Sequence, residues 1–280
     1  MTGNGSVAAG ADALTRLRAA KAWVFDMDGV LYVGTQTLPG VADLLNALRL
    51  RGREIMLATN NSMSTPDMYV KKLAGMGIDV PASAILTSAL ATRDYLEREL
   101  PAGSGLFVIG MPALREQLFA DGAFHPVQYC EEKPAALVLG LDKEFTYEKL
   151  KAATAAVREG ARFIATNADA TLPTETGLVP GAGSIVAAIQ VASGVTPVII
   201  GKPETPMLEM ALARLGVAPH EAVMVGDRLD TDIHAGHRAG MLTALVLTGV
   251  SSREEISGAA AMPDVVANDL PSLTAALIGG

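Results

Sequence analysis

Short apolar runs alternate along the chain with longer segments in which apolar residues recur at helical spacing. The runs are apolar throughout, which is typical of strands buried on both faces of a parallel sheet. Helices between such strands provide the crossovers that parallel pairing requires. The pattern therefore predicts an α/β fold with a parallel sheet covered by helices. In the outer parts of the chain the expected strands are 23–25, 54–58, 198–200, 223–225 and 243–247, and the expected helices are 41–51, 66–76, 206–215 and 232–239.

The middle third continues the alternation, and no shift in composition marks a border. Residues 177–201 carry no charge over 25 residues and so imitate a membrane span, which needs about 20. Five glycines and two prolines divide this stretch into a turn, a helix (184–192) and a strand (196–200). We therefore expect no membrane partner and a cytoplasmic protein. The expected strands of the middle third are 106–109, 135–139 and 162–165, and its expected helices are 113–119 and 147–159.

Charge and cysteine content narrow the classes of function. The 22 Lys and Arg against 30 Asp and Glu give a formal net charge of −8. This balance argues against nucleic acid as a partner, because phosphate backbones are bound by clustered cations. Cys130 stands alone, which excludes an intramolecular disulfide, and we interpret it as a small apolar residue. Residues 1–14 lack the features of a signal peptide and are expected to form a flexible tail.

Two carboxylates follow the expected strand 23–25. Asp26 and Asp28 stand in the string FDMDGV, where Gly29 permits an abrupt turn. Ligand sites of parallel sheets gather at the carboxyl ends of strands. Carboxylates this close raise one another's pKa unless a cation lies between them, and Mg²⁺ is the hard, oxygen-binding ion that suits them. Taken alone, the pair could form a metal clip or a turn.

A second acidic cluster follows the expected strand 223–225. Asp232 opens an expected helix and could serve only as its N-cap, whereas Asp227 occupies the tip of its strand as Asp26 does. Asp230 is expected to face solvent.

Two further strand ends carry polar residues suited to an anion. Thr59, Asn60 and Asn61 offer a hydroxyl and amides ahead of the helix that begins at residue 66. Lys202 stands in the string GKP, where the proline stiffens the turn and fixes the direction of the lysine. Either segment alone is more often an ordinary solvated loop.

Together, four strand ends carry two acids, a hydroxyl, a lysine and further acids, in that order. Phosphoryl transfer requires this set: a nucleophile, an acid–base group, donors for phosphate oxygens and a metal site. The four histidines offer no better scheme. His234 and His237 lie three residues apart on an expected helix without the spacing of a metal-binding pair, and His125 and His220 adjoin prolines.

The strings DMDGVLYVG, LPG, ATNNS, GKP and GDRLDTDI resemble the haloacid dehalogenase (HAD) superfamily of phosphatases, and within it the NagD-like branch, subfamily IIA. That branch includes 4-nitrophenylphosphatases, phosphoglycolate phosphatases and nucleotide monophosphatases. The resemblance implies a Rossmann-like parallel-sheet core. It also implies a Mg²⁺-dependent phosphatase that hydrolyses small phosphate monoesters through an aspartyl-phosphate.

The resemblance also suggests a role for each core residue. Asp26 is expected to be the nucleophile and Asp28 the general acid and base. The metal is expected to be held by Asp26, the backbone carbonyl of Asp28 and Asp227, with Asp232 steadying a bound water. The residues expected to stabilise the phosphate are Thr59, Asn60, Asn61 and Lys202. Lys202 is also expected to hold Asp26 in line.

Spacing indicates an inserted domain. Only 10 residues separate Asp28 from Pro39, too few for a lid domain, whereas 142 residues separate Thr59 from Lys202. We therefore predict a separate α/β domain at 87–179, inserted into a core formed by 1–86 and 180–280.

The resemblance implies that the inserted domain is a C2-type cap that closes over the site and carries a homodimer interface. Its substrate-contacting loop is expected to contain Thr166, Asn167 and Asp169, although these residues could equally form a polar turn after a strand.

Other functions remain open at this stage. A phosphotransferase or mutase shares the same core chemistry. A phospho-acceptor signalling module would be a single small domain without an inserted cap, and a catalytically silent protein would not need every acid. Among substrates, nucleotide monophosphates, phosphoglycolate, glycerol phosphates and sugar phosphates are all compatible with the sequence, and the oligomeric state is undetermined.

Overall fold

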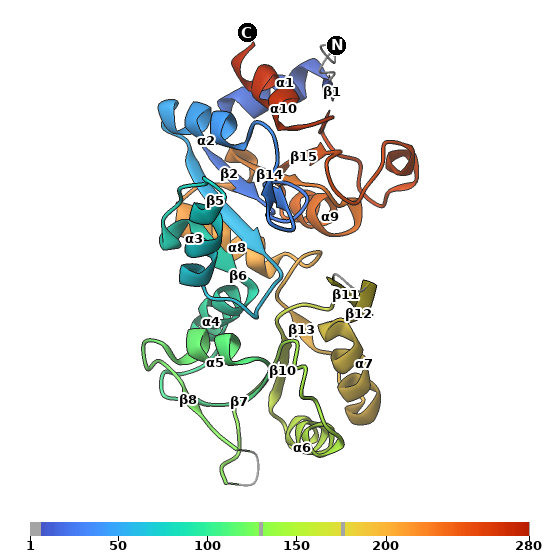
Figure 1. Ribbon diagram of the computed structural model, residues 1–280. Coiled ribbons are helices and arrows are strands. Elements are labelled where there is room, and N and C mark those ends of the chain that lie inside the picture. The colour runs from blue at the N-terminus through green and yellow to red at the C-terminus, as the bar shows by residue number, and fades with distance from the viewer. Residues whose placement is uncertain (1–6, 129–130, 175–176, 280) are drawn as a thin grey trace. The chain divides into compact units, whose positions relative to one another are not determined.

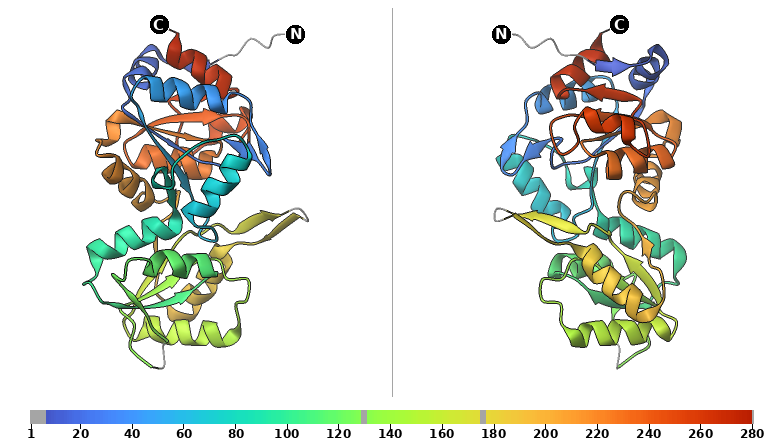
Figure 2. Two further views of the ribbon diagram at one scale, coloured as in Figure 1. Left: turned by 60° about the vertical axis from the view of Figure 1, so that its left-hand side comes forward. Right: turned by 90° about the vertical axis from the view of Figure 1, so that its right-hand side faces the viewer.

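The computed structural model describes residues 7–128, 131–174 and 177–279. The chain divides into two compact units. The first unit comprises the residues up to Thr59, Pro66–Leu86 and the residues from Lys202 onward, and the second comprises Asn60–Thr65 and Thr87–Gly201. Each unit has its own sheet and its own helices (Figures 1 and 2). The predicted α/β class is confirmed.

The first unit is built on a seven-stranded sheet with the order β1-β16-β15-β14-β2-β5-β6. The pairs from β16 to β5 are parallel, and β1 joins β16 antiparallel. From β2 the chain adds β5 and β6 on one side and later β14, β15 and β16 on the other, so β2 and β14 flank the point where the winding reverses. Such switch points are where open α/β sheets bind ligands. The strands are β1 (Val7–Ala9), β2 (Ala22–Phe25), β5 (Glu54–Thr59), β6 (Ile85–Thr87), β14 (Ala222–Gly226), β15 (Leu242–Val246) and β16 (Val265–Ala267).

Helices cover this sheet. All four residues of β2 are buried, as expected of a strand that is apolar throughout. Trp23 and Phe25 stack with ring centroids 6.0 Å apart and join a core that also contains Leu44 and Leu273. The unit contains α1 (Ala11–Ala19), α2 (Val41–Leu50), α3 (Pro66–Gly75), α8 (Pro206–Leu215), α9 (His234–Arg238) and α10 (Leu270–Ile278), with a hairpin of β3 (Tyr32–Val33) and β4 (Gln36–Thr37).

Regular structure begins nearer to the N-terminus than the sequence indicated. The prediction of a flexible tail over 1–14 is wrong for residues 7–14, because Val7 pairs with Ala267 in the antiparallel edge of the sheet and α1 begins at Ala11. Leu17 of α1 is fully buried in the core. The segment is short and rich in Gly and Ala, and its pairing partner lies about 260 residues away, so local pattern could not reveal it.

The second unit has a five-stranded sheet with the order β13-β10-β9-β7-β8, and all its pairs are parallel. Its core combines Leu137, Leu139 and Phe163 of the sheet with Val157 and Ile189 of two helices. The strands are β7 (Gly105–Ile109), β8 (His125–Pro126), β9 (Ala136–Leu139), β10 (Arg162–Ala165) and β13 (Val198–Ile199), with a hairpin of β11 (Thr171–Thr174) and β12 (Gly177–Pro180). The helices are α4 (Ser88–Glu99), α5 (Pro112–Phe119), α6 (Tyr147–Arg158) and α7 (Ala182–Ser193).

The second unit extends beyond the inserted domain predicted at 87–179. It continues to Gly201, because β13 pairs with β10 and α7 contributes Ile185 and Ile189 to the core of this unit. It also takes in Asn60–Thr65. The uncharged stretch 177–201 forms β12, α7 and β13. Among the described residues, no helix has the length and apolar character needed to cross a membrane.

Candidate active site

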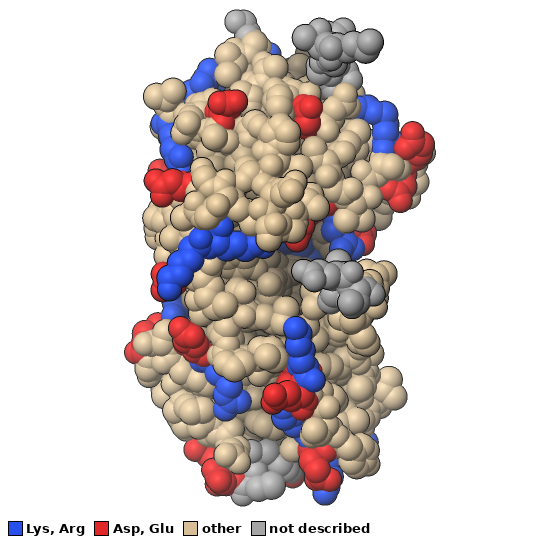
Figure 3. All heavy atoms as spheres, in the orientation of Figure 1, with Lys and Arg blue, Asp and Glu red and all other residues tan. Residues whose placement is uncertain are grey.

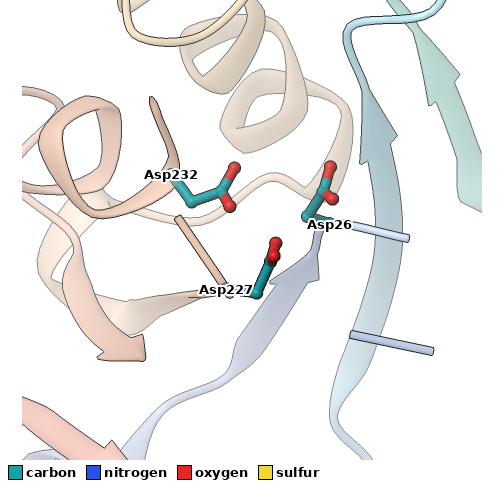
Figure 4. Close-up of side chains that lie close together, drawn as sticks. All are labelled: Asp26, Asp227 and Asp232. Atoms are coloured by element: carbon teal, nitrogen blue, oxygen red, sulfur yellow. The ribbon is translucent and has the colours of Figure 1, made fainter. Parts of the chain in front are cut away.

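Three carboxylates from separate segments converge at the carboxyl end of the first unit's sheet (Figure 4). Asp26 follows β2 and Asp227 follows β14, and the amide of Asp26 donates to the carbonyl of Val225 across this parallel pair at 2.9 Å. Asp232 comes from a single π-helical turn, Leu229–Ile233, that precedes α9. One carboxylate oxygen of each acid lies within 4.8 Å of the others. The strand ends therefore bring together three acids that are up to 206 residues apart in sequence (26 to 232).

Lys202 joins two of these acids. Its Nζ lies 2.6 Å from Asp26 Oδ1 and 2.8 Å from Asp232 Oδ1, and it donates to the carbonyl of Ala58 at 3.2 Å. Only 2% of the lysine side chain and 1% of the Asp232 side chain are exposed, whereas 17% of the Asp26 side chain is. The buried ammonium thus places Asp26 while leaving that carboxylate accessible.

The burial of these charges shifts their proton affinities. Burial raises the pKa of Asp26 from 3.8 to about 7, with Lys202 opposing the shift and Asp232 adding to it. Burial, with Asp232 nearby, also raises the pKa of Asp227 to about 6. Burial by itself would lower the pKa of Lys202, but the two neighbouring carboxylates outweigh it and the pKa is raised. Lys202 is therefore a cation, and the carboxylates around it carry more negative charge than one cation offsets.

The loop after β15 supports the acids. The amide of Val250 donates to Asp227 Oδ2 at 2.7 Å, and the hydroxyl of Thr248 donates to the carbonyl of Gly29 at 2.6 Å. Asp232 Oδ2 accepts from the amide of Arg228 at 3.2 Å. Sequence reasoning missed the 248–250 segment. Its signal was the same as for the other segments: small and hydroxyl residues directly after a buried strand of the same sheet.

Two glycines allow the backbone to approach Asp227. Gly29 has φ +80°, and a Cβ there would lie 2.5 Å from Asp227 Oδ2. A Cβ on Gly249 would overlap the same carboxylate. Both positions therefore require glycine, because the side chain of Asp227 fills the space that any larger residue would occupy.

Asp28 lies outside the carboxylate cluster. It is exposed and forms an isolated bridge with Tyr32, whose ring is covered by the Lys72 ammonium at 3.9 Å. Partial burial raises the pKa of Asp28, and the charge of Lys72 opposes the shift. An accessible carboxyl group two residues after Asp26 is available to exchange protons with a bound molecule.

Asn60 and Asn61, which were predicted to bind phosphate, form hydrogen bonds with residues of the second unit. Asn60 Nδ2 donates to the Asp169 carboxylate at 3.3 Å, and Asn167 Nδ2 donates to the carbonyl of Asn60 at 2.8 Å. Asn61 Oδ1 accepts from the amide of Met63 at 2.7 Å. The structure thus joins Asn60 to two of the residues predicted for the substrate-contacting loop. Thr166, the third, is fully buried, and Thr59 remains in the first unit as the last residue of β5.

Comparison with known proteins places this geometry in a family. The family model for haloacid dehalogenase-like hydrolases matches residues 23–123, and a second, HAD-hydrolase-like model matches residues 199–273. The acid sugar phosphatase of Staphylococcus aureus is 40% identical over 261 residues, which cover 93% of this chain and 99% of that protein. The chain belongs to the haloacid dehalogenase-like hydrolases.

Solved structures of HAD hydrolases agree with this assignment. NagD from E. coli K-12 superposes with a TM-score of 0.81 and 34% identity, covering 88% of this chain and 95% of that chain. A glycerol phosphate phosphatase from Mycobacterium tuberculosis, solved in complex with magnesium, gives a TM-score of 0.84 and 34% identity over 92% of this chain and 77% of that chain. The predicted membership of the NagD-like branch is confirmed.

The carboxylate site of this HAD hydrolase fits a divalent cation. Asp227 Oδ1 is buried, and among the described residues it has no hydrogen-bond partner. A buried carboxylate oxygen without a donor is costly unless a cation satisfies it. The three acids offer only oxygen ligands, which Mg²⁺ prefers over softer sites. Asp26, Asp227 and Asp232 are therefore the residues that could hold the ion.

Asp232, Asp230 and the histidines differ in how they relate to the carboxylate site. Asp232 does not cap α9, because the N-cap position belongs to Ile233 and no side chain caps it. The side chain of Asp230 is 68% exposed and pairs with Arg228, as expected of a solvent-facing acid. Among the described residues, no cluster of three metal-binding side chains includes a histidine. Cys130 lies outside the described residues.

Proposed function

We propose that this HAD hydrolase is a Mg²⁺-dependent phosphatase that hydrolyses small phosphate monoesters through an aspartyl-phosphate. One observation carries the proposal: Lys202 holds the accessible Asp26 at 2.6 Å and the buried Asp232 at 2.8 Å, beside an oxygen of Asp227 that has no hydrogen-bond partner in the described part of the chain. The names of the matched phosphatases support the same reaction class.

Asp26 attacks the phosphorus and forms an acyl phosphate while the alcohol oxygen leaves. Asp28 protonates that oxygen. It then takes a proton from the water that attacks the aspartyl-phosphate, which releases inorganic phosphate and restores both carboxyl groups. Lys202 orients Asp26 and, with Thr59, stabilises the charge on the transferring oxygens. When bound, Mg²⁺ would neutralise charge on the phosphoryl oxygens and on the carboxylates that hold it.

We propose sugar phosphates and glycerol phosphates as the substrate class, because the matched relatives carry those names. The second unit would serve as the cap, and Asn60, Asn167 and Asp169 would contact the part of the substrate that leaves. A panel of phosphate monoesters, compared by kcat/KM, tests the class: sugar and glycerol phosphates should exceed nucleotide monophosphates at least tenfold, and the reverse order would contradict it. The predicted homodimer and cytoplasmic location stay proposals, and sedimentation that gives only monomer would count against the dimer.

The nucleophile is tested with Asp26→Asn, assayed with Mg²⁺ and 4-nitrophenyl phosphate. We expect turnover to fall at least a thousandfold, because the amide cannot form the acyl phosphate. Asp230→Asn is the matched control, since it changes an exposed acid of the same site region and should leave turnover within twofold. Substantial residual turnover in Asp26→Asn would refute the assignment. In the wild type, release of 4-nitrophenol that requires an added acceptor alcohol and yields no inorganic phosphate would indicate a transferase.

A further inference from the structure

The first unit holds a second candidate site in a cavity of about 330 Å³ at the amino end of β5. Figure 1 labels this strand. Arg49 reaches it from the last turn of α2, Arg53 and Glu54 from the start of β5, and Arg214 from the last turn of α8. The remaining wall is largely apolar and includes Ile55, Met56, Val80 and Leu215. The volume falls at the lower end of the range for small-molecule sites.

This cavity is separate from the carboxylate site. β5 begins at Glu54, which lines the cavity, and ends at Thr59, which belongs to the candidate active site. Five residue steps along a strand span roughly 16 Å, at about 3.3 Å per residue. The cavity therefore lies at the amino ends of the strands, opposite the carboxyl ends that carry Asp26. Its side chains take no part in the proposed chemistry.

Two of its arginines are held in place by neutral oxygens. Arg49 donates to the carbonyl of Asp79 and to Asn46 Oδ1, and Arg53 Nη2 donates to the carbonyl of Arg18 at 3.0 Å. Arg53 Nε is buried and has no hydrogen-bond partner among the described residues. Neither arginine forms an ion pair with a carboxylate in the described part of the chain. Both guanidinium groups are thus oriented without being neutralised.

Elsewhere in the molecule, arginines commonly sit beside acids. Arg162 pairs with Glu99 at 2.7 Å and Arg238 with Glu204 at 2.8 Å. On the face shown in Figure 3, basic and acidic side chains are interspersed. The residues that line the cavity include three arginines and one glutamate, on a chain whose net charge is −8, and Arg49 and Arg53 have no carboxylate partner among the described residues. The cations repel one another there, which an anion between them would relieve.

We propose that this cavity binds a small organic polyanion, a metabolite that bears phosphate or carboxylate groups beside an apolar portion. Guanidinium groups match the paired oxygens of both anions, and the apolar wall accommodates the carbon part. The site is distinct from the one that holds the reacting phosphate, so the proposal does not depend on the proposed function.

The first test is calorimetric titration of the full chain with pyrophosphate and, separately, with citrate, in EDTA. We expect at least one of the two probes to bind, and the Arg49→Gln/Arg214→Gln double variant to bind it at least tenfold more weakly. Arg51→Gln is the matched control, because Arg51 lies on the same chain segment but does not line the cavity. It should bind within twofold of wild type. Comparison of the probes shows whether phosphate or carboxylate is preferred.

A second measurement needs no substitution. Phenylglyoxal modification of the wild-type chain, read by peptide mass spectrometry, should be suppressed at Arg49 and Arg214 by the bound probe and unchanged at Arg51. Turnover of 4-nitrophenyl phosphate should be the same in the double variant and in wild type, which keeps this test separate from that of the phosphatase. Absence of binding by both probes, equal weakening by Arg51→Gln, or no selective protection would overturn the proposal.

Discussion

Replacing Lys202 with methionine removes the ammonium that lies between Asp26 and Asp232. Methionine keeps most of the apolar stem, so the change is chiefly one of charge. The ammonium makes contacts of 2.6 and 2.8 Å with carboxylates in a site where Lys202 itself is 2% exposed. Removing one partner of a buried ion pair costs about 3–5 kcal/mol, since the other charges stay buried and unpaired.

Protonation of Asp26 reduces this loss of stability, and the reduction depends on pH. The pKa of Asp26 is already about 7, and Lys202 lowers it, so the variant raises it further. At pH 6 Asp26 in the variant is protonated and needs no counter-ion. At pH 8 the variant must either protonate Asp26 against the solution pH or bury its carboxylate without the lysine, and both cost free energy. We expect Lys202→Met to lower the free energy of unfolding by about 3–4 kcal/mol at pH 8 and by about half as much at pH 6 in EDTA.

Urea unfolding followed by tryptophan fluorescence measures this directly. Trp23 is the single tryptophan, is fully buried in β2, and so reports on the first unit. Lys21→Met is the matched control: Lys21 pairs with Glu221 at 2.6 Å, but its side chain is 62% exposed, and exposed pairs contribute little. A Lys202→Met variant as stable as the control at pH 8, or equally destabilised at both pH values, would refute the reasoning.

Three further outcomes are expected. The free energy of unfolding of the metal-free wild type should fall by on the order of 3 kcal/mol between pH 5 and pH 8, because the pKa values of Asp26 (about 7) and Asp227 (about 6) are raised from 3.8 and the folded chain binds more protons than the unfolded chain. Urea titrations that show stability rising with pH would contradict this. Saturating Mg²⁺ should reduce the dependence of stability on pH. Asp227→Asn should raise the Mg²⁺ concentration for half-maximal turnover at least tenfold, and an unchanged metal titration would exclude this residue as a ligand. Gly249→Ala should cost about 1–3 kcal/mol by forcing the Asp227 carboxylate to move, and a melting temperature equal to wild type would show that the loop yields freely.

The sequence predicted the elements and the site where the signal was local. The buried strand that ends in Asp26 and the strand that ends in Asp227 were identified because apolar runs and acids stand side by side in the chain. The predictions that failed concern strands whose pairing partners lie far away in the sequence. Val7 lies in a short strand whose own residues carry little pattern, so the N-terminal strand was missed. The strands that contain Ala165 and Ile199 were predicted, but their pairing was not, so the full extent of the second unit was missed.

The same reason explains what was missed in the site. The contact of Lys202 with Asp26 was expected and is confirmed, but its second contact, with Asp232, follows from side-chain packing that no spacing rule encodes. The amide of Val250 acts through its backbone, so its side chain gives no sign of the bond to Asp227. The link between Asn60 and Asp169 depends on two loops that are 109 residues apart.

The pairing of β2 with β14 also constrains the order in which the protein can assemble. Phe25 and Val225 are register partners across 200 residues of chain (225 − 25), and a ribosome exposes them at very different times. Residues 87–201 are continuous and can fold as a unit while β14 is still unmade. The first unit must wait, because β2 has β5 on one side but lacks β14 on the other until the last third emerges, and non-local pairing of this kind is slow. Asp26 therefore remains without its lysine and its fellow acids through most of synthesis, and the reactive site is completed only near the end.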